Sequence, residues 1–515
     1  MKKIFAILMI ICLLAGALSI TASAALLSEL DAIPEGVVLR VTAIKGAETV
    51  LIGDYTNFEE GWYNAIKEAR PSRTEFTEYE RVIVDLYTDW ISAEDGNFTD
   101  DKWMQGNGFG FNNDTIYIQD DVKITLNLNG HTIKRVLPDS QSDGEVIYID
   151  EDADVIINNG TITGGKSTNG AGGIHIHDAH VTLNDVHIVG NVADNDDGGG
   201  IALYDDAVLV MNGGSFRDNS IDGVSFDENF DCYGGAIYIE GSTAIFKGVE
   251  FKNNQNTSDE DYGAAIYADA SEVYLYECTF DGNGVEDKGK NICGTTSIVH
   301  AEDSELVMEK ATFTNNGSYY YDDGGYLGTT RTDLYSSLVV LDDSTFTLSD
   351  DSLFRNNGSY FAISVYDDSH LYVENTTFEN NKSFVLFSMN EHYDDSYFKN
   401  CTFESNKVPN TEDLTEDSNN VWAHTFAVRD EALTFIDCKM SDSTYYDQDE
   451  MVFVDTDAAN GRSLRFGSIF GEGSLTMIVA LLALIASGVS IFLTVYYNKR
   501  KIAPAAAYNE EETEE

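Results

Sequence analysis

The sequence has few basic residues and few cysteines for its length. Its 515 residues include 31 Lys and Arg against 88 Asp and Glu, a formal net charge of −57. Nucleic acid is therefore excluded as a partner, because phosphate binding requires clustered Lys and Arg. Anionic polymers would be repelled in the same way, whereas the excess acid suits divalent cations. Of the six cysteines, Cys12 lies in the N-terminal apolar run, and the odd number that remains does not resemble a disulfide framework.

Uncharged apolar runs mark the two ends of the chain. A basic start precedes such a run over residues 4–18, and Ala22 and Ala24 offer a cleavage site of small residues. We therefore expect residues 1–24 to be a secretory signal peptide, with an uncleaved anchor helix as the alternative.

The second apolar run predicts a transmembrane helix over residues 474–497. It is long enough to cross a hydrocarbon core of ~30 Å and is followed directly by three basic residues, 499–501. The chain is thus expected to be a single-pass protein of the cell membrane. Its large N-terminal part would be extracellular, and residues 498–515 would form a cytoplasmic tail.

The N-terminal region, residues 25–120, contains one clear helical pattern. The stretch "TNFEEGWYNAIKEARP" begins with Thr56 and Glu59 spaced as a capping box, carries an apolar stripe, and ends at Pro71. The stretch "RVIVDLYTDWI" that follows predicts a strand. An amphipathic helix ahead of a long β region would cover the open end of that region's core.

Residues 121–445 consist of a repeated phrase. The stretch "GGAIYIEGSTAIFKGVEFKNN" is followed nine residues later by "GAAIYADASEVYLYECTFDGN", and the two align without a gap. Each copy predicts a short strand, a turn, a second strand and a closing Phe-x-x-Asn. The closing asparagines recur at intervals of 24 to 41 residues: Asn219, Asn254, Asn283, Asn316, Asn357, Asn381 and Asn406.

A period of this size predicts a solenoid in which stacked copies share one continuous core. Val, Ile, Thr, Tyr and Phe dominate the repeats, which favours strands over leucine-rich repeats. We therefore expect a parallel β-helix with one phrase per coil. Phe251 and Phe280 would stack inside, Tyr238 would point outward, and the closing asparagines would form a hydrogen-bonded ladder. The cysteines before the Phe position would face the core as small hydrophobic residues; they are Cys278, Cys401 and Cys438.

These "GGAI"-like and Phe-x-x-Asn phrases resemble the right-handed parallel β-helix repeats of bacterial surface proteins. Similar phrases occur in the polymorphic membrane proteins of chlamydiae and in adhesin-like proteins, and pectate-lyase-like enzymes share the wider fold. The resemblance implies an all-β, right-handed parallel β-helix solenoid. In this chain we expect an N-terminal capping helix before it, a terminal coil and linker over residues 446–473, and the transmembrane helix.

A pair of acidic residues followed by Ala or Ser recurs between the two strands of a repeat. At one register such pairs would place carboxylates in a column, where Ca²⁺ could relieve their repulsion. The alternative is that Asp is a good turn former that keeps a β edge hydrated. The glycine-rich nonapeptide of calcium-binding toxin repeats is absent. The candidate calcium ligands are Asp205, Asp206, Asp342, Asp343, Asp367 and Asp368.

Tyrosines suggest a binding surface for a carbohydrate or a surface protein. Three of them occupy the outward middle of the same strand in different coils, and others lie in a long insertion, where solenoids often bind partners. Tyr is also a favoured strand residue, so the same pattern has a purely structural explanation. The candidate ligand-binding residues are Tyr148, Tyr238, Tyr267, Tyr319, Tyr320 and Tyr321.

A zinc site and an enzymatic activity are further hypotheses from the residues, and each lacks a supporting motif. A zinc site among His175, His177, His180 and His187 is one hypothesis, but no fixed ligand spacing supports it. A polysaccharide lyase or glycoside hydrolase of the pectate-lyase-like fold would need a basic proton acceptor near calcium carboxylates, or set aspartates with a Gly-His-Gly turn. Neither Gly-His-Gly nor Asn-Thr-Asp occurs. No catalytic residue is assigned, and adhesion or binding at the cell surface is the favoured function.

Overall fold

The structure is a computed structural model in which residues 34–458 form one compact unit. The residues described are 33–70, 79–92, 111–112, 115–137, 144–222, 232–256, 262–284, 297–317, 337–359, 361–381, 384–388, 396–406, 426–428, 433–440 and 451–454. Residues 1–24, the apolar stretch 474–497 and the tail 498–515 lie outside these ranges. Among the residues described, no helix is long and apolar enough to span a bilayer.

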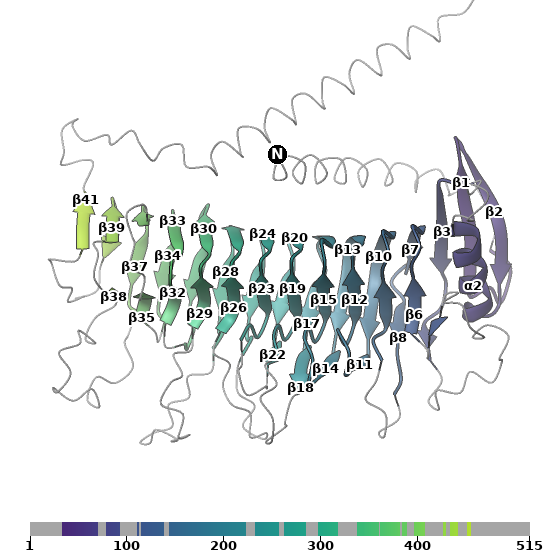
Figure 1. The fold of residues 1–515 in the computed structure, drawn as a ribbon, viewed down its shortest axis with the longest axis horizontal. Coiled ribbons are helices and arrows are strands. Elements are labelled where there is room, and N and C mark those ends of the chain that lie inside the picture. The colour runs from purple at the N-terminus through teal and green to yellow at the C-terminus, as the bar shows by residue number, and fades with distance from the viewer. Residues whose placement is uncertain are drawn as a thin grey trace, which may run out of the picture. The chain divides into compact units, whose positions relative to one another are not determined.

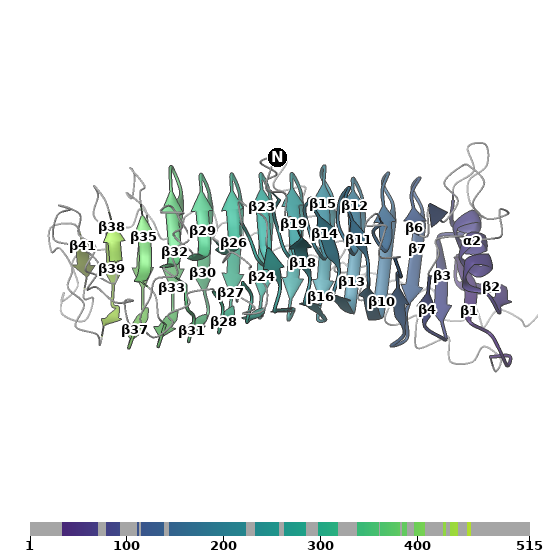
Figure 2. The same ribbon diagram turned by 90° about the horizontal axis from the view of Figure 1, so that it is seen from below.

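Strands from successive repeats lie side by side and form three sheets (Figures 1 and 2). The 12-stranded sheet consists of β5 (Phe111–Asn112), β6 (Thr115–Ile118), β9 (Ile147–Ile149), β12 (Ile174–His177), β15 (Ile201–Tyr204), β19 (Ile237–Glu240), β23 (Ile266–Asp269), β26 (Ser297–Glu302), β29 (Ser337–Asp342), β32 (Phe361–Tyr366), β35 (Phe384–Ser388) and β38 (Phe426–Val428). The 4-stranded sheet consists of β11 (Lys166–Ser167), β14 (Val192–Asp194), β18 (Ser220–Asp222) and β22 (Gln255–Asn256).

The third sheet has 25 strands, because most coils contribute two segments to it. Its strands are β1 (Leu39–Lys45), β2 (Glu48–Tyr55), β3 (Arg81–Leu86), β4 (Trp90–Ile91), β7 (Lys123–Asn127), β8 (Thr132–Lys134), β10 (Asp154–Thr163), β13 (His180–Val189), β16 (Val208–Asn212), β17 (Ser215–Arg217), β20 (Thr243–Lys247), β21 (Glu250–Lys252), β24 (Glu272–Tyr276), β25 (Thr279–Asp281), β27 (Glu305–Glu309), β28 (Thr312–Thr314), β30 (Thr345–Ser349), β31 (Leu353–Arg355), β33 (His370–Glu374), β34 (Thr377–Glu379), β36 (Tyr397–Lys399), β37 (Thr402–Glu404), β39 (Leu433–Ile436), β40 (Lys439–Met440) and β41 (Met451–Val454).

One repeated phrase makes one coil. The first phrase supplies β19, β20 and β21, the second supplies β23, β24 and β25, and the three pairs of strands are parallel and in register. Tyr238 pairs with Tyr267, and Phe251 pairs with Phe280. The prediction of a parallel β-helix is therefore confirmed. The parallel ladder begins before residue 121, since β3 already pairs with β7 and β4 with β8.

The interior holds a column of stacked phenylalanine rings. Phe280 is fully buried, and its ring centroid lies 4.7 Å from that of Phe251 and 4.3 Å from that of Phe313. Neighbouring rings along this stack are within 25° of parallel, as expected when one aromatic residue recurs at the same register. The phenylalanine stack consists of Phe216, Phe251, Phe280, Phe313, Phe354, Phe378 and Phe403.

The closing asparagines form the predicted ladder, and nearly all are fully buried. Asn283 Nδ2 donates to the carbonyl of Phe251 and to Oδ1 of Asn316, at 2.9 and 3.0 Å. Its own Oδ1 accepts from the backbone N and the Nδ2 of Asn254. Each side chain thus satisfies backbone groups that the turn leaves unpaired. The asparagine ladder runs through Asn191, Asn219, Asn254, Asn283, Asn316, Asn357, Asn381 and Asn406.

A small antiparallel unit closes the N-terminal end of the core. β1 pairs antiparallel with β2 and β3, and α2 (Phe58–Ala69) packs on them through a buried face that includes Trp62. The capping helix is as predicted, but its N-cap is Asn57, whose Oδ1 accepts from the backbone N of Glu60 at 2.8 Å. The predicted capping box from Thr56 is therefore wrong by one residue.

Candidate functional site

The outer face of the 12-stranded sheet carries a continuous row of aromatic rings, here called the aromatic ladder. Six of its members share one register, and the seventh, Tyr204, lies two residues from that register and fills the gap beside Ala202. Adjacent ring centroids are 4.6 to 5.7 Å apart. The aromatic ladder consists of Tyr117, Tyr148, His175, Tyr204, Tyr238, Tyr267 and His300.

Two of the predicted ligand-binding tyrosines are covered. Tyr238 and Tyr267 point out of the coil, yet only 7% and 5% of their surface is exposed. Tyr233 and Tyr262, which precede the glycines that lead into β19 and β23, pack over them, and Tyr233 stacks on Tyr267 at 4.3 Å. The expectation that these two rings lie open to a ligand is therefore wrong.

The ladder's exposed part lies toward its N-terminal end. Tyr148 is half-buried, and its ring stacks on those of Tyr117 and His175. Because its flat faces are occupied by neighbouring rings, Tyr148 presents an edge and a hydroxyl to solvent rather than a platform for a sugar ring. Tyr319, Tyr320 and Tyr321 lie outside the described residues.

The ladder borders a row of four carboxylates, here called the carboxylate row. The row occupies the next outward position of β19, β23, β26 and β29, where in-register partners are separated by ~4.8 Å. Two phenol groups of the aromatic ladder donate hydrogen bonds to carboxylates of the row: Tyr238 donates to Glu240, and Tyr267 donates to Glu302. None of the ion pairs found among the described residues involves the row. The carboxylate row consists of Glu240, Asp269, Glu302 and Asp342.

Like charges crowd around Asp269 in this row. Burial raises the pKa of Asp269, and the nearby carboxylates of Glu302, Glu240 and Asp303 raise it further. A hydroxyl donor or a cation would relieve this repulsion, since either supplies the positive charge density that the face lacks.

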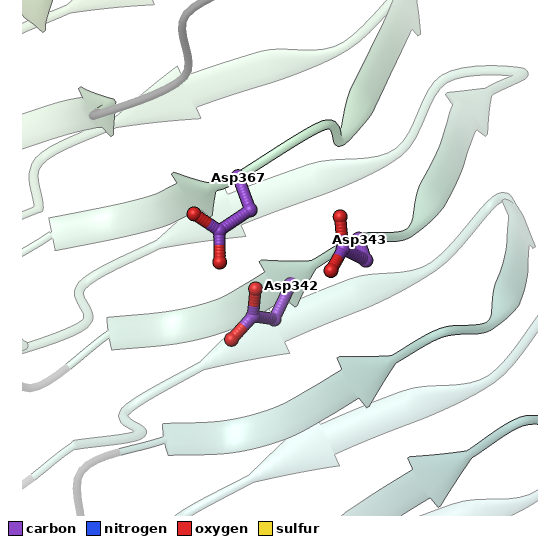
Figure 3. A group of neighbouring side chains, drawn as sticks. All are labelled: Asp342, Asp343 and Asp367. Atoms are coloured by element: carbon purple, nitrogen blue, oxygen red, sulfur yellow. The ribbon is translucent and has the colours of Figure 1, made fainter.

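Three aspartates at one end of the row lie close enough to share a cation (Figure 3). One carboxylate oxygen from each of Asp342, Asp343 and Asp367 lies within 4.8 Å of the other two. Oδ1 of Asp342 is buried without a hydrogen-bond partner. Burial, together with the neighbouring carboxylate of Asp367, raises the pKa of Asp342 to about 6. Oxygen ligands of this kind suit Ca²⁺, which also needs further oxygens to complete its shell.

The other three candidate calcium ligands do not join this group. Asp205 and Asp206 lie in an exposed turn several coils away, where Asp205 binds His177. Asp368 is exposed, and its backbone N donates to Asp343 at 3.2 Å. The acidic pairs also do not form an unbroken column, because Gly241 and Ala270 occupy the equivalent turns in two coils.

Replacing Asp342 by Asn should make the protein's free energy of unfolding less dependent on pH. The folded-state pKa lies above the unfolded one, so the folded state gains a proton between about pH 6 and pH 4 and is stabilised as the pH falls through that range. Asp342→Asn should therefore raise the free energy of unfolding at pH 7 and leave it unchanged near pH 4. Urea unfolding at both pH values measures this, with Asp206→Asn, at an exposed turn several coils away, as control. Equal effects of Asp342→Asn at the two pH values would contradict the assignment.

Backbone conformation explains many of the acidic turn residues. Asp303, Asp343 and Asp367 have φ of 47°, 44° and 45°, in the left-handed region that Asp and Asn tolerate better than most residues. The need for a turn-forming residue therefore explains Asp at these positions. It does not explain the acidic residue of the carboxylate row that precedes each turn, because that residue lies in a strand and needs no left-handed conformation.

Ala270 tests this explanation, because it occupies the same turn with φ 48°. Ala270→Gly should stabilise the protein by about 0.5–1 kcal/mol, since relief of the left-handed strain exceeds the extra entropy of the unfolded chain. The reciprocal change Gly241→Ala, one coil earlier, places its Cβ in open space and should destabilise by a similar amount. Thermal unfolding of both variants measures the effect, and a neutral Gly241→Ala would refute it.

The histidines serve the coil stack rather than a zinc site. His177 Nδ1 and Nε2 lie 2.8 and 2.7 Å from carboxylate oxygens of Asp150 and Asp205, so it bridges three coils. Burial lowers its pKa, but these hydrogen bonds outweigh burial and raise it overall. Burial lowers the pKa of His175, within the ladder, to about 4. Among the described residues, no group of three metal-ligating side chains includes a histidine.

Among the described residues, two arginines that lie near acidic residues in the sequence pair with glutamates away from the row. Arg217 pairs with Glu250, and Arg355 pairs with Glu379, all on the 25-stranded sheet. Among the described residues, neither arginine makes a hydrogen bond or an ion pair with the carboxylate row or with the aspartates of Figure 3. A further arginine near acidic residues in the sequence, Arg429, lies outside the described residues.

Part of the site was missed by the analysis of sequence motifs. Glu240 and Asp269 precede Gly and Ala, so neither belongs to an acidic pair. The signal that identifies them is their place two residues after the ladder position, in "IYIE" and "IYAD". The cover formed by Tyr233 and Tyr262 has a similar signal, a tyrosine directly before the small residues that open each phrase.

Residues 229–425 match the family described as right handed beta helix region. No protein of described function and no solved structure shows a significant match to the chain. The family match and the parallel sheets together identify this part of the chain as a right-handed parallel β-helix.

Proposed function

We propose that this right-handed β-helix is displayed at the cell surface, where its 12-stranded sheet binds a neutral, hydroxyl-rich carbohydrate. The observation that carries the proposal is the carboxylate row beside the aromatic ladder. Carboxylates without a cationic partner accept hydrogen bonds from sugar hydroxyls, and the phenol edges of the ladder offer further polar groups. Residues 1–24 and 474–497 would export the chain and anchor it in the membrane.

Charge narrows the class of ligand. A net charge of −57 disfavours anionic polysaccharides, so neutral glycans, or a basic surface of a partner protein, are the ligands that this face suits. Ca²⁺ at Asp342, Asp343 and Asp367 would add a positive centre at one end of the row, where a sugar could supply the missing oxygen ligands.

The test is a glycan array probed with residues 25–471, with and without Ca²⁺. The proposal expects binding to neutral glycans and no release of reducing or unsaturated ends from the same polysaccharides. Release of such ends would instead support the lyase or hydrolase alternative. Absence of binding to any neutral glycan, at micromolar protein and in both conditions, would refute the carbohydrate proposal.

A further inference from the structure

Two cysteines occupy equivalent positions in neighbouring coils. Cys401 immediately precedes β37, Cys438 immediately precedes β40, and these strands pair in register from Thr402 and Lys439. The backbone N of Lys439 donates to the carbonyl of Cys401 at 2.8 Å. Adjacent residues in such a ladder have Cα atoms ~4.8 Å apart, within the range of about 4.4–6.8 Å that a disulfide requires.

The two thiols also point the same way. Cys401 Sγ lies 3.4 Å from the carbonyl oxygen of Lys399, two residues earlier, and 3.5 Å from that of Val373 in the preceding coil. Cys438 Sγ makes the same two contacts one coil later, at 3.5 Å with Ile436 and 3.4 Å with Phe398.

We propose that Cys401 and Cys438 are a redox-active pair that forms a disulfide clip between these two coils. The oxidant is a small-molecule disulfide. The thiolate of Cys438 attacks one of its sulfurs, forms a mixed disulfide and releases one small thiol. Cys401 loses its proton to solvent and attacks Sγ of Cys438, which releases the second small thiol. Two protein thiols are thus oxidised by two electrons, and the small disulfide is reduced to two thiols.

The surroundings favour this order of attack. Cys438 is half-buried and Cys401 is fully buried, so the small disulfide reaches Cys438 first. The neighbouring thiol of Cys401 lowers the pKa of Cys438, whereas the thiol of Cys438 and burial raise the pKa of Cys401. Cys438 is therefore the thiol with the larger thiolate fraction.

The chain contains a matched control for this geometry. Cys278 occupies the same position of its own coil and is also buried, but its neighbours in the adjacent coils are Val249 and Ala311. It should therefore stay a thiol under conditions that oxidise the pair. Ser352, at the same position, establishes that a hydroxyl is accommodated there.

The experiment treats the purified full chain with oxidised glutathione, denatures it, alkylates the free thiols and maps the peptides by mass. We expect a cross-linked peptide pair containing Cys401 and Cys438, lighter by two hydrogens than the reduced peptides, with Cys278 alkylated. Dithiothreitol should restore alkylation of both. Alkylation of both cysteines after oxidation would overturn the proposal, and so would a cross-link from either one to another cysteine.

A variant provides a second readout in the folded protein. The thermal midpoint of the oxidised chain should fall on the order of 5 °C when dithiothreitol is added, because the clip constrains the unfolded chain. Cys438→Ser should remove this redox dependence, whereas Cys278→Ser should leave it in place. A shift that persists in Cys438→Ser would overturn the proposal even if the cross-link forms in denaturant.

Discussion

Replacing Asn283 by Ala should lower the free energy of unfolding by about 3–5 kcal/mol, one of the two largest effects expected in this protein. The side chain is fully buried and makes two donor and two acceptor hydrogen bonds. Its removal leaves the Phe251 carbonyl and the backbone N of Asn254 without these partners, away from water. Such groups lose their solvation and gain nothing in return.

The matched control is Asn184→Ala. Asn184 belongs to a second, half-buried asparagine row, where it bonds only to the side chains of Asn158 and Asn212. Water can replace those bonds, so its loss should cost under about 1 kcal/mol. Urea unfolding of both variants measures the difference. Equal effects at the two sites would mean that the buried ladder does not stabilise the stack in the way described.

Replacing Phe280 by Ala should cost a similar amount, about 3–5 kcal/mol. The ring is fully buried between those of Phe251 and Phe313, so truncation removes apolar contacts on both faces and opens a cavity. Neighbouring coils cannot collapse into that cavity without breaking the register of the sheets.

Phe280→Leu separates packing volume from ring stacking. Leucine keeps most of the volume, so its cost should be about 1–2 kcal/mol, mainly the lost aromatic contacts. Thermal unfolding of the two variants gives the comparison. A loss below about 1 kcal/mol for Phe280→Ala would show that the phenylalanine stack is not a main source of stability.

The coil and its core follow from the repeats, because side-chain alternation and a common register fix each position. That is why the inward direction of Phe251 and Phe280 and the ladder through Asn283 could be predicted from the printed sequence. The burial of Cys278 and Cys401 follows from the same register.

Features that depend on segments outside the repeat could not be predicted from the register of the repeats. The cover over Tyr238 and Tyr267 comes from Tyr233 and Tyr262, whose positions depend on how each connection re-enters the coil. The antiparallel pairing of β1 with β2 lies in a region without periodicity. The meeting of Asp342 with Asp367 depends on one extra residue in the turn after Tyr366, which offsets the two acidic pairs.

The most direct test of the binding face compares the affinity of a glycan found on the array for two triple variants. Glu240→Gln, Asp269→Asn and Glu302→Gln together neutralise three members of the carboxylate row. Glu272→Gln, Glu305→Gln and Glu309→Gln change the net charge equally on the 25-stranded sheet of nearby coils. Titration calorimetry should show affinity reduced at least about tenfold in the first variant, since three charge-assisted hydrogen bonds are weakened, and unchanged in the second. Equal affinity of both variants and the parent protein would contradict the assignment of this face as the binding site.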